Sequence, residues 1–157
     1  MSRRSTTVSL EASSQGTSLT ITRVLKASQQ AVWDAWSKPH DLCQWMGPAA
    51  IERCEALAFD LREGGGFRFR MHTASGEQPV VAGVFRRVAV PTELAFSWAW
   101  EGDDGPSSLV TVELDWVPEG VRMTLTHRDF PTSDARDRHL DGWHGSFDKL
   151  DGFLVSQ

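Results

Sequence analysis

The spacing of apolar residues restricts the fold more than any other feature of the chain. From Ile51 to Arg128, apolar and polar residues alternate in short runs, a pattern typical of half-buried strands. Turn-forming stretches such as Gly64–Gly66 and Asp103–Pro106 divide this region into about six strands in antiparallel, meander-like order. After Phe130 the spacing becomes helical, with apolar residues at steps of three and four: Leu140, Trp143, Phe147, Leu150 and Leu154. We therefore expect a long C-terminal helix that covers one face of an antiparallel sheet, an α+β arrangement.

The region before residue 51 predicts one more strand and two short helices. Residues 19–25 alternate apolar and polar side chains, as a strand does. Ser28 fits the N-cap of a first helix, and Pro39 fits the first turn of a second helix that ends at Gly47. The first 17 residues include eight Ser or Thr and few large apolar residues, a composition that favours disorder. The prediction is a flexible tail over 1–17 followed by a single domain over 18–157.

The composition excludes several classes of protein. The formal net charge is −5, whereas nucleic-acid-binding domains usually carry a basic excess, so no nucleic-acid partner is expected. No apolar run approaches the length of a membrane span, and the N-terminus lacks the apolar core of a signal peptide. The two cysteines, Cys43 and Cys54, are too few for a disulfide framework. A cytoplasmic protein without a membrane partner is therefore expected.

Five short motifs, in a fixed order, resemble a known family. They are Val32–Trp36, Trp45–Pro48, Asp60–Gly65, Pro91–Leu94 and Gly142–Trp143. With them the chain from Ser18 onward resembles the SRPBCC (START-like, helix-grip) superfamily, and within it the C-terminal-type domain of the activator of heat shock protein 90 ATPase. The resemblance implies a helix-grip fold: a curved antiparallel sheet of about seven strands wrapped around a long C-terminal helix, with two short helices after the first strand.

The aromatic residues are the strongest remaining signal, since the chain has seven Trp, eight Phe and no Tyr. In helix-grip folds the long helix stands away from the sheet and leaves a cavity, so the resemblance implies that inward-facing residues line a pocket. His127 would be a polar group facing that pocket, or else a core histidine bonded to the backbone. The candidate ligand-binding residues are Trp45, Phe69, Met71, Phe85, Phe96, Trp98, Trp100, Met123, Leu125, His127, Trp143 and Phe147.

Other constellations give weaker signals. No pair of histidines has the spacing of a metal site on one helix face, and no nucleophile motif is present, so no metal, cofactor or catalytic residue is assigned. Ser146, within the last helix, reads as a surface hydroxyl. A basic patch on the outer sheet face is either an ordinary solvated surface or a site for an acidic protein partner: Arg68, Arg70, His72, Arg86 and Arg87.

These observations lead to three hypotheses. The first is a non-enzymatic domain that binds a hydrophobic or aromatic small molecule in a cavity between the sheet and the C-terminal helix. The second, implied by the resemblance, is a co-chaperone-like module that binds a chaperone or another protein. The third is a cyclase- or hydrolase-like enzyme that uses the same cavity, with His127 as its candidate polar group. The sequence leaves both a monomer and a homodimer open.

Overall fold

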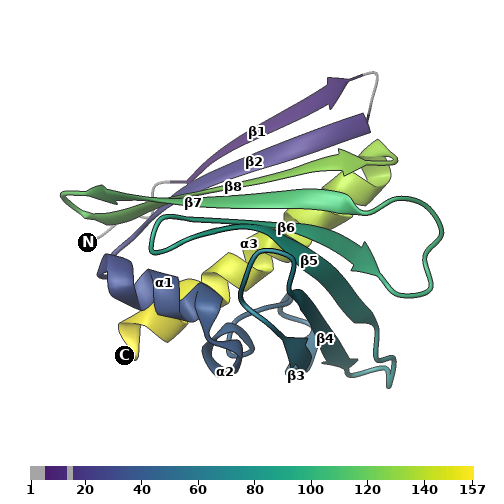
Figure 1. Ribbon diagram of the computed structural model, residues 1–157, viewed down its shortest axis with the longest axis horizontal. Helices are drawn as coiled ribbons and strands as arrows, with labels where there is room; N and C mark the ends of the chain where they lie inside the picture. The colour runs from purple at the N-terminus through teal and green to yellow at the C-terminus, as the bar shows by residue number, and fades with distance from the viewer. Residues whose placement is uncertain (1–5, 14–15) are drawn as a thin grey trace.

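The computed structural model describes residues 6–13 and 16–157, which form one curved antiparallel sheet and three helices (Figure 1). The strands follow one another along the sheet in the order β1-β2-β8-β7-β6-β5-β4-β3. They are β1 (Thr6–Ser13), β2 (Gly16–Leu25), β3 (Ile51–Phe59), β4 (Gly66–Thr73), β5 (Val80–Ala89), β6 (Glu93–Trp100), β7 (Ser108–Val117) and β8 (Gly120–Phe130). The helices are α1 (Gln29–Ser37), α2 (Pro39–Leu42) and α3 (Ser133–Val155). The predicted α+β helix-grip class is confirmed.

The six strands predicted between residues 51 and 128 are present, each paired with its neighbours in the chain. β2 pairs antiparallel with β8, so the first part of the chain lies beside the last strand of the meander. Helices α1 and α2 then lead from β2 to β3, the opposite edge of the sheet. Figure 1 shows α3, in yellow, lying across one face of the curved sheet.

The prediction of a flexible tail over 1–17 is wrong for Thr6–Ser13, which forms the edge strand β1, and for Gly16 and Thr17, which begin β2. The register of β1 with β2 runs without interruption from Thr6 opposite Arg23 to Ser13 opposite Gly16. Backbone hydrogen bonds hold this strand, whereas the composition argument counted only side-chain burial. The two apolar side chains Val8 and Leu10 stay exposed. The sheet therefore has eight strands rather than about seven, while residues 1–5, 14 and 15 of the expected tail lie outside the described residues.

The helix boundaries follow the predicted capping signals. Ser28 Oγ accepts a hydrogen bond from the Ala31 backbone N–H at 3.1 Å, which confirms Ser28 as the N-cap of α1. Pro39 begins α2 as expected, but α2 ends at Leu42 after one turn. The buried residues Trp45 and Met46, expected on this helix, lie in the chain that follows it.

No helix within the described part of the chain is long and apolar enough to cross a membrane.

The core lies between α3 and the sheet face that it covers. The predicted apolar stripe of α3 is buried at Trp143, Phe147, Leu150 and Leu154. Arg23 of β2 shares the inner face with Leu19 and Ile21 and is only 3% exposed. Its Nη1 atom lies 3.2 Å from carboxylate oxygens of both Asp148 and Asp151 on α3. A buried cation thus joins β2 to the helix, at a position where the alternating pattern of β2 needs an inward residue.

Gly83 of β5 marks the tightest approach of the sheet backbone to the core. A Cβ at this position would lie 1.9 Å from the Ser97 carbonyl oxygen and 2.6 Å from the ring of Phe67. Both neighbours are fixed, since Ser97 belongs to the adjacent strand β6 and Phe67 is 3% exposed. Only glycine fits this position without displacement of a strand or a buried ring.

We therefore expect Gly83→Ala to lower the free energy of unfolding by about 3 kcal/mol, because the methyl group overpacks a rigid site. The matched control is Gly152→Ala in α3, where a Cβ meets nothing within 4 Å. That change should raise the stability by roughly 0.5–1 kcal/mol, since alanine is the better helix former. Urea unfolding followed by tryptophan fluorescence measures both. Equal stabilities for the two variants would contradict the tight contact at Gly83.

Candidate ligand-binding pocket

A pocket of about 260 Å³ opens between α3, the segment from Met46 to Ile51, and the strands β4 and β6. Most of its surface is apolar, and the polar side chains that reach it come from α3. Its lining residues are Met46, Gly47, Pro48, Ile51, Met71, Trp98, Trp100, Arg138, His139, Gly142, Trp143 and Ser146.

The wall formed by α3 follows from the helical spacing. His139 and Trp143 are four residues apart, as are Gly142 and Ser146, so each pair lies on neighbouring turns of one helix face. Gly142 has no side chain, and a Cβ there would meet no atom within 4 Å. The missing side chain at Gly142 therefore leaves open space beside the Trp143 ring.

The opposite rim, Met46–Ile51, is fastened to α3. The Ser146 hydroxyl accepts a hydrogen bond from the Gly47 N–H at 2.9 Å and donates one to the Gly142 carbonyl at 2.9 Å. Lys149 Nζ donates to the Pro48 carbonyl at 3.3 Å. Ser146 is 2% exposed, so its interpretation as a surface hydroxyl is wrong. The Gly47 N–H, at a backbone φ of +99°, points toward the helix and is buried there. The Ser146 hydroxyl supplies the acceptor that this N–H needs.

His127 lies behind the pocket rather than in its lining. The Trp143 indole N–H donates to His127 Nδ1 at 3.0 Å. The ring proton is therefore on Nε2, which donates to Ser108 Oγ at 2.7 Å, and Ser108 donates in turn to the Trp98 carbonyl at 3.1 Å. Burial, with a smaller contribution from His139, holds the pKa of His127 well below its usual range. The ring is thus neutral, with both nitrogens occupied.

His139 forms a second tryptophan–histidine pair, and this pair lines the pocket. The Trp100 indole N–H donates to His139 Nε2 at 3.1 Å, and His139 Nδ1 donates to the Ala135 carbonyl at 2.7 Å. Burial lowers the pKa of His139, partly opposed by its bond to Ala135. A neutral imidazole is consistent with the mainly apolar lining.

Trp98 is the lining residue with an unused hydrogen-bond donor. It is 6% exposed, and its Nε1 finds no acceptor among the described residues. The same holds for Trp36 Nε1, and both rings border a second, smaller void of about 20 Å³ beneath the pocket. Buried polar groups in proteins are almost always hydrogen-bonded. The fold therefore leaves the Nε1 donor of Trp98 unpaired in a ring that lines the pocket, although the Nε1 atom itself is enclosed by protein.

The structure separates the twelve predicted site residues into four sets. Met71, Trp98, Trp100 and Trp143 line the pocket. Phe69, Phe85 and Phe96 line the smaller void. His127 does not line the pocket but accepts a hydrogen bond from the lining residue Trp143. The remainder are buried in the hydrophobic core: Trp45, Met123, Leu125 and Phe147.

Sequence reasoning missed His139, Arg138 and the rim from Met46 to Ile51. The four-residue step from His139 to Trp143 was the available signal for the histidine. The rim gave no such signal, because residues 46–50 form irregular chain between α2 and β3, and Ile51 is the first residue of β3.

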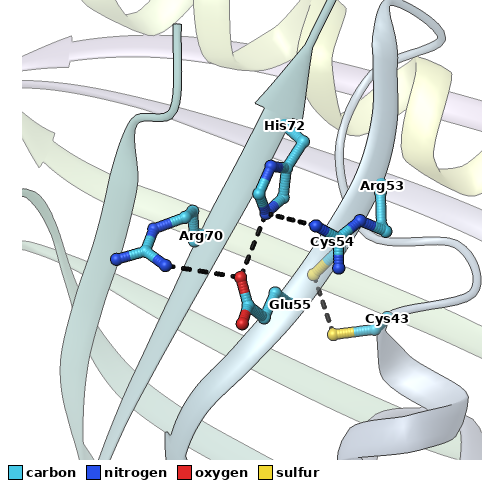
Figure 2. Close-up of polar contacts among 6 residues, drawn as sticks. All are labelled: Cys43, Arg53, Cys54, Glu55, Arg70 and His72. Atoms are coloured by element: carbon cyan, nitrogen blue, oxygen red, sulfur yellow. Dashed lines mark hydrogen bonds and ion pairs between the residues drawn. The ribbon is translucent and has the colours of Figure 1, made fainter. Parts of the chain in front are cut away.

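The basic patch on the outer face is largely neutralised by carboxylates. Arg68 makes a bidentate ion pair with Glu101, in which Nε and Nη2 donate to the two carboxylate oxygens at 2.7 and 2.9 Å. Figure 2 shows Arg70 and His72 converging on Glu55, with distances of 3.4 and 3.0 Å. The hydrogen bond from His72, helped by the nearby arginines, lowers the pKa of Glu55. The solvated-surface interpretation suits these exposed pairs.

Within residues 6–13 and 16–157, no three His, Cys, Asp or Glu side chains gather closely enough to hold a metal ion.

A curved antiparallel sheet wrapped around a long C-terminal helix, with an apolar pocket between them, defines a helix-grip domain of the SRPBCC type. Residues 26–154 match the family described as "Activator of Hsp90 ATPase homolog 1-like protein". The chain belongs to this family, as the sequence motifs predicted. No curated protein is a significant match to the chain.

Several solved structures share the fold. The AHSA1 protein from Silicibacter pomeroyi is 28% identical, with a TM-score of 0.78 over 88% of this chain and 97% of its own. A protein from Arthrobacter aurescens, solved in solution, is 20% identical, with a TM-score of 0.81 over 95% of this chain and 92% of its own. CalU16 from Micromonospora echinospora is 23% identical, with a TM-score of 0.65 over 98% of this chain and 87% of its own. The latter two likenesses concern the fold alone.

The neutral state of His127 makes the stability depend on pH. Its pKa is depressed in the folded state, so the unfolded chain binds the extra proton once the pH falls below the unfolded value of about 6.5. Stability is fully present above that value and decreases as the pH falls toward the folded pKa. His127→Gln should remove this contribution. As the pH falls, the free energy of unfolding of the variant should decrease less steeply than that of the wild type, by about 1.4 kcal/mol per pH unit.

Urea unfolding of the wild-type chain and His127→Gln between about pH 7 and about pH 5 measures the two slopes. His139→Gln serves as the comparison. Burial also lowers the pKa of His139, but His139 is only partly buried, whereas His127 is fully buried. Parallel slopes for the wild type and His127→Gln would show that His127 is not held neutral.

Proposed function

We propose that this protein binds an aromatic or hydrophobic small molecule that carries a hydrogen-bond acceptor, in the pocket between α3, β4 and β6. The observation that carries the proposal is the buried Trp98 indole N–H, which lacks an acceptor while its ring lines a mainly apolar pocket. An unpaired buried donor costs about 1–3 kcal/mol. A ligand oxygen or nitrogen that displaced the groups enclosing Nε1 and accepted its hydrogen bond would recover part of this free energy.

The size and lining of the pocket narrow the class of ligand. A volume of about 260 Å³ lies just below the range of roughly 300–1,000 Å³ typical of small-molecule sites, so a compact ligand of no more than about three rings is expected. Met71, Trp100 and Trp143 offer broad apolar and aromatic contact surfaces.

Arg138 is the charged residue of the lining, and it is exposed at the pocket. Its guanidinium would favour a ligand whose acceptor is anionic, such as a carboxylate or sulfonate attached to the ring system. A weakly acidic aromatic compound is therefore the proposed ligand class.

The two alternative functions, a protein-binding module and an enzyme, are less well supported by the residues on which each depends. A partner with an acidic surface would have to compete with Glu101, Glu55 and Glu93 for the arginines of the outer face. An enzyme that uses His127 would need a free ring nitrogen, whereas both nitrogens of His127 are hydrogen-bonded. An ATPase assay with a heat-shock chaperone tests the protein-binding alternative directly.

Gly142→Leu should block the pocket, because the new side chain extends into the open space beside Trp143. The probe is anilinonaphthalene sulfonate, an anionic aromatic dye whose fluorescence rises in apolar sites. We expect its dissociation constant to rise by about tenfold or more, as the leucine and the dye compete for one volume. The matched control is Gly152→Leu on the same helix, where a Cβ is equally unobstructed but lies outside the pocket.

A neutral dye of similar shape, phenylnaphthylamine, separates shape from charge. Arg138→Ala should weaken binding of the sulfonate dye and leave binding of the neutral dye unchanged. Failure of both dyes to bind the wild-type chain, or equal binding by Gly142→Leu and Gly152→Leu, would refute the proposed function.

A further inference from the structure

The two cysteines of the chain, 11 positions apart, lie in direct contact. Their sulfur atoms are 2.8 Å apart, and both residues are partly buried (Figure 2). Cys43 directly follows α2, and Cys54 lies in β3. A disulfide requires about 2.05 Å between the sulfur atoms, so closing the bond needs a movement of only about 0.8 Å from the 2.8 Å contact.

The segment between the two cysteines is the rim of the pocket. Met46, Gly47, Pro48 and Ile51 line the pocket, and all four lie between Cys43 and Cys54. The centre of this segment is held to α3 by the bonds from Ser146 to Gly47 and from Lys149 to Pro48. The cysteine pair joins its two ends. A covalent bond between the sulfur atoms would therefore close the rim into a ring that is fastened to the helix.

The surroundings make the two thiols unequal. The two thiols share one hydrogen bond, in which either sulfur can be the donor. With Cys54 as the donor, this bond lowers the pKa of Cys43 against the opposing effects of burial and Glu55. The same bond and burial raise the pKa of Cys54, and Lys149 only partly opposes them. Cys43 thus loses its proton first and is the better nucleophile of the pair.

We propose that Cys43 and Cys54 are a reversible dithiol–disulfide pair, oxidised by peroxides or by low-molecular-weight disulfides, and that their cross-link fixes the rim of the pocket. The statement about the rim concerns ligand access and rests on the proposed function, whereas the cross-link itself does not.

The chemistry balances with hydrogen peroxide as the oxidant. The Cys43 thiolate attacks one peroxide oxygen, the O–O bond breaks, and a sulfenic acid and hydroxide form. Cys54 loses its proton and attacks the Cys43 sulfur, so the S–S bond forms as the S–O bond breaks and water leaves. Two thiols and one peroxide give one disulfide and two waters. A dithiol reductant reverses the reaction through a mixed disulfide, with its own sulfur atoms oxidised.

Thiol counting on the full chain tests the cross-link. After treatment with hydrogen peroxide, the two free thiols should fall to none, and the intact protein should lose the mass of two hydrogen atoms while it stays monomeric on a non-reducing gel. Dithiothreitol should restore both thiols. Cys43→Ser and Cys54→Ser are the matched controls, since each keeps one cysteine and cannot form the internal bond. Intermolecular dimers, or stable sulfinic acid without a cross-link, would overturn the proposal.

The reduced and oxidised proteins should also differ in stability and in the mobility of the rim. A closed loop of this length raises Tm by roughly 5–10 °C through the entropy of the unfolded chain. Hydrogen exchange of the amides between residues 46 and 51 should slow roughly tenfold upon oxidation and stay unchanged in Cys43→Ser. An unchanged exchange rate in the cross-linked protein would refute the effect on the rim.

Binding of anilinonaphthalene sulfonate connects this pair to the proposed function. The cross-linked protein should release the dye at least several-fold more slowly than the reduced protein. If the dye binds neither form, the proposed function fails, while the thiol count and hydrogen exchange still decide the fate of the cross-link. If the dye leaves both forms at equal rates, the cross-link does not control access.

Discussion

The hydrogen bond between Trp143 and His127 fixes the helix against the sheet, and the pocket depends on it. α3 packs closely against β2 and β8. At the middle of the helix, Trp143 donates to His127 of β8. One to two turns further on, Asp148 and Asp151 pair with Arg23 of β2. A straight helix that is fixed along β2 and β8 cannot also follow the curve of the sheet toward β4. The space left on that side is the pocket.

The tryptophans define what the pocket can recognise. An indole N–H is a donor without acceptor capacity, so each buried tryptophan needs a partner. Trp45 uses the Ala35 carbonyl, while Trp100 and Trp143 use neutral histidines. Trp98 and Trp36 are left without an acceptor among the described residues. With no tyrosine in the chain, no phenol hydroxyl competes for ligand acceptors, and the donor at Trp98 stands out in a mainly apolar lining.

Periodicity predicted the strands after residue 51 and the C-terminal helix because burial on one face leaves a direct trace in the sequence. Ser28 was equally predictable, since capping depends on a local hydroxyl. The edge strand β1 was not, because its backbone bonds to β2 need no particular side chains. The inward aromatics were identified, yet Phe147 fills the core whereas Trp100 lines the pocket. Whether an inward aromatic residue lies in the core or lines the pocket depends on the position of α3 over the sheet. The pattern of apolar residues does not specify that position.

The walls of the pocket differ in how freely they can change. Trp98 and Trp143 belong to the buried core, so a movement of either ring would disrupt the packing between helix and sheet. The rim is irregular chain from Met46 up to Ile51, where β3 begins, and it is held by a serine hydroxyl, a lysine ammonium group and two adjacent thiols. A change in these contacts alters local mobility at little cost to the core. If the pocket binds the proposed ligand, control of ligand access belongs at the rim, and the thiol pair is the contact there whose covalent state is proposed to change.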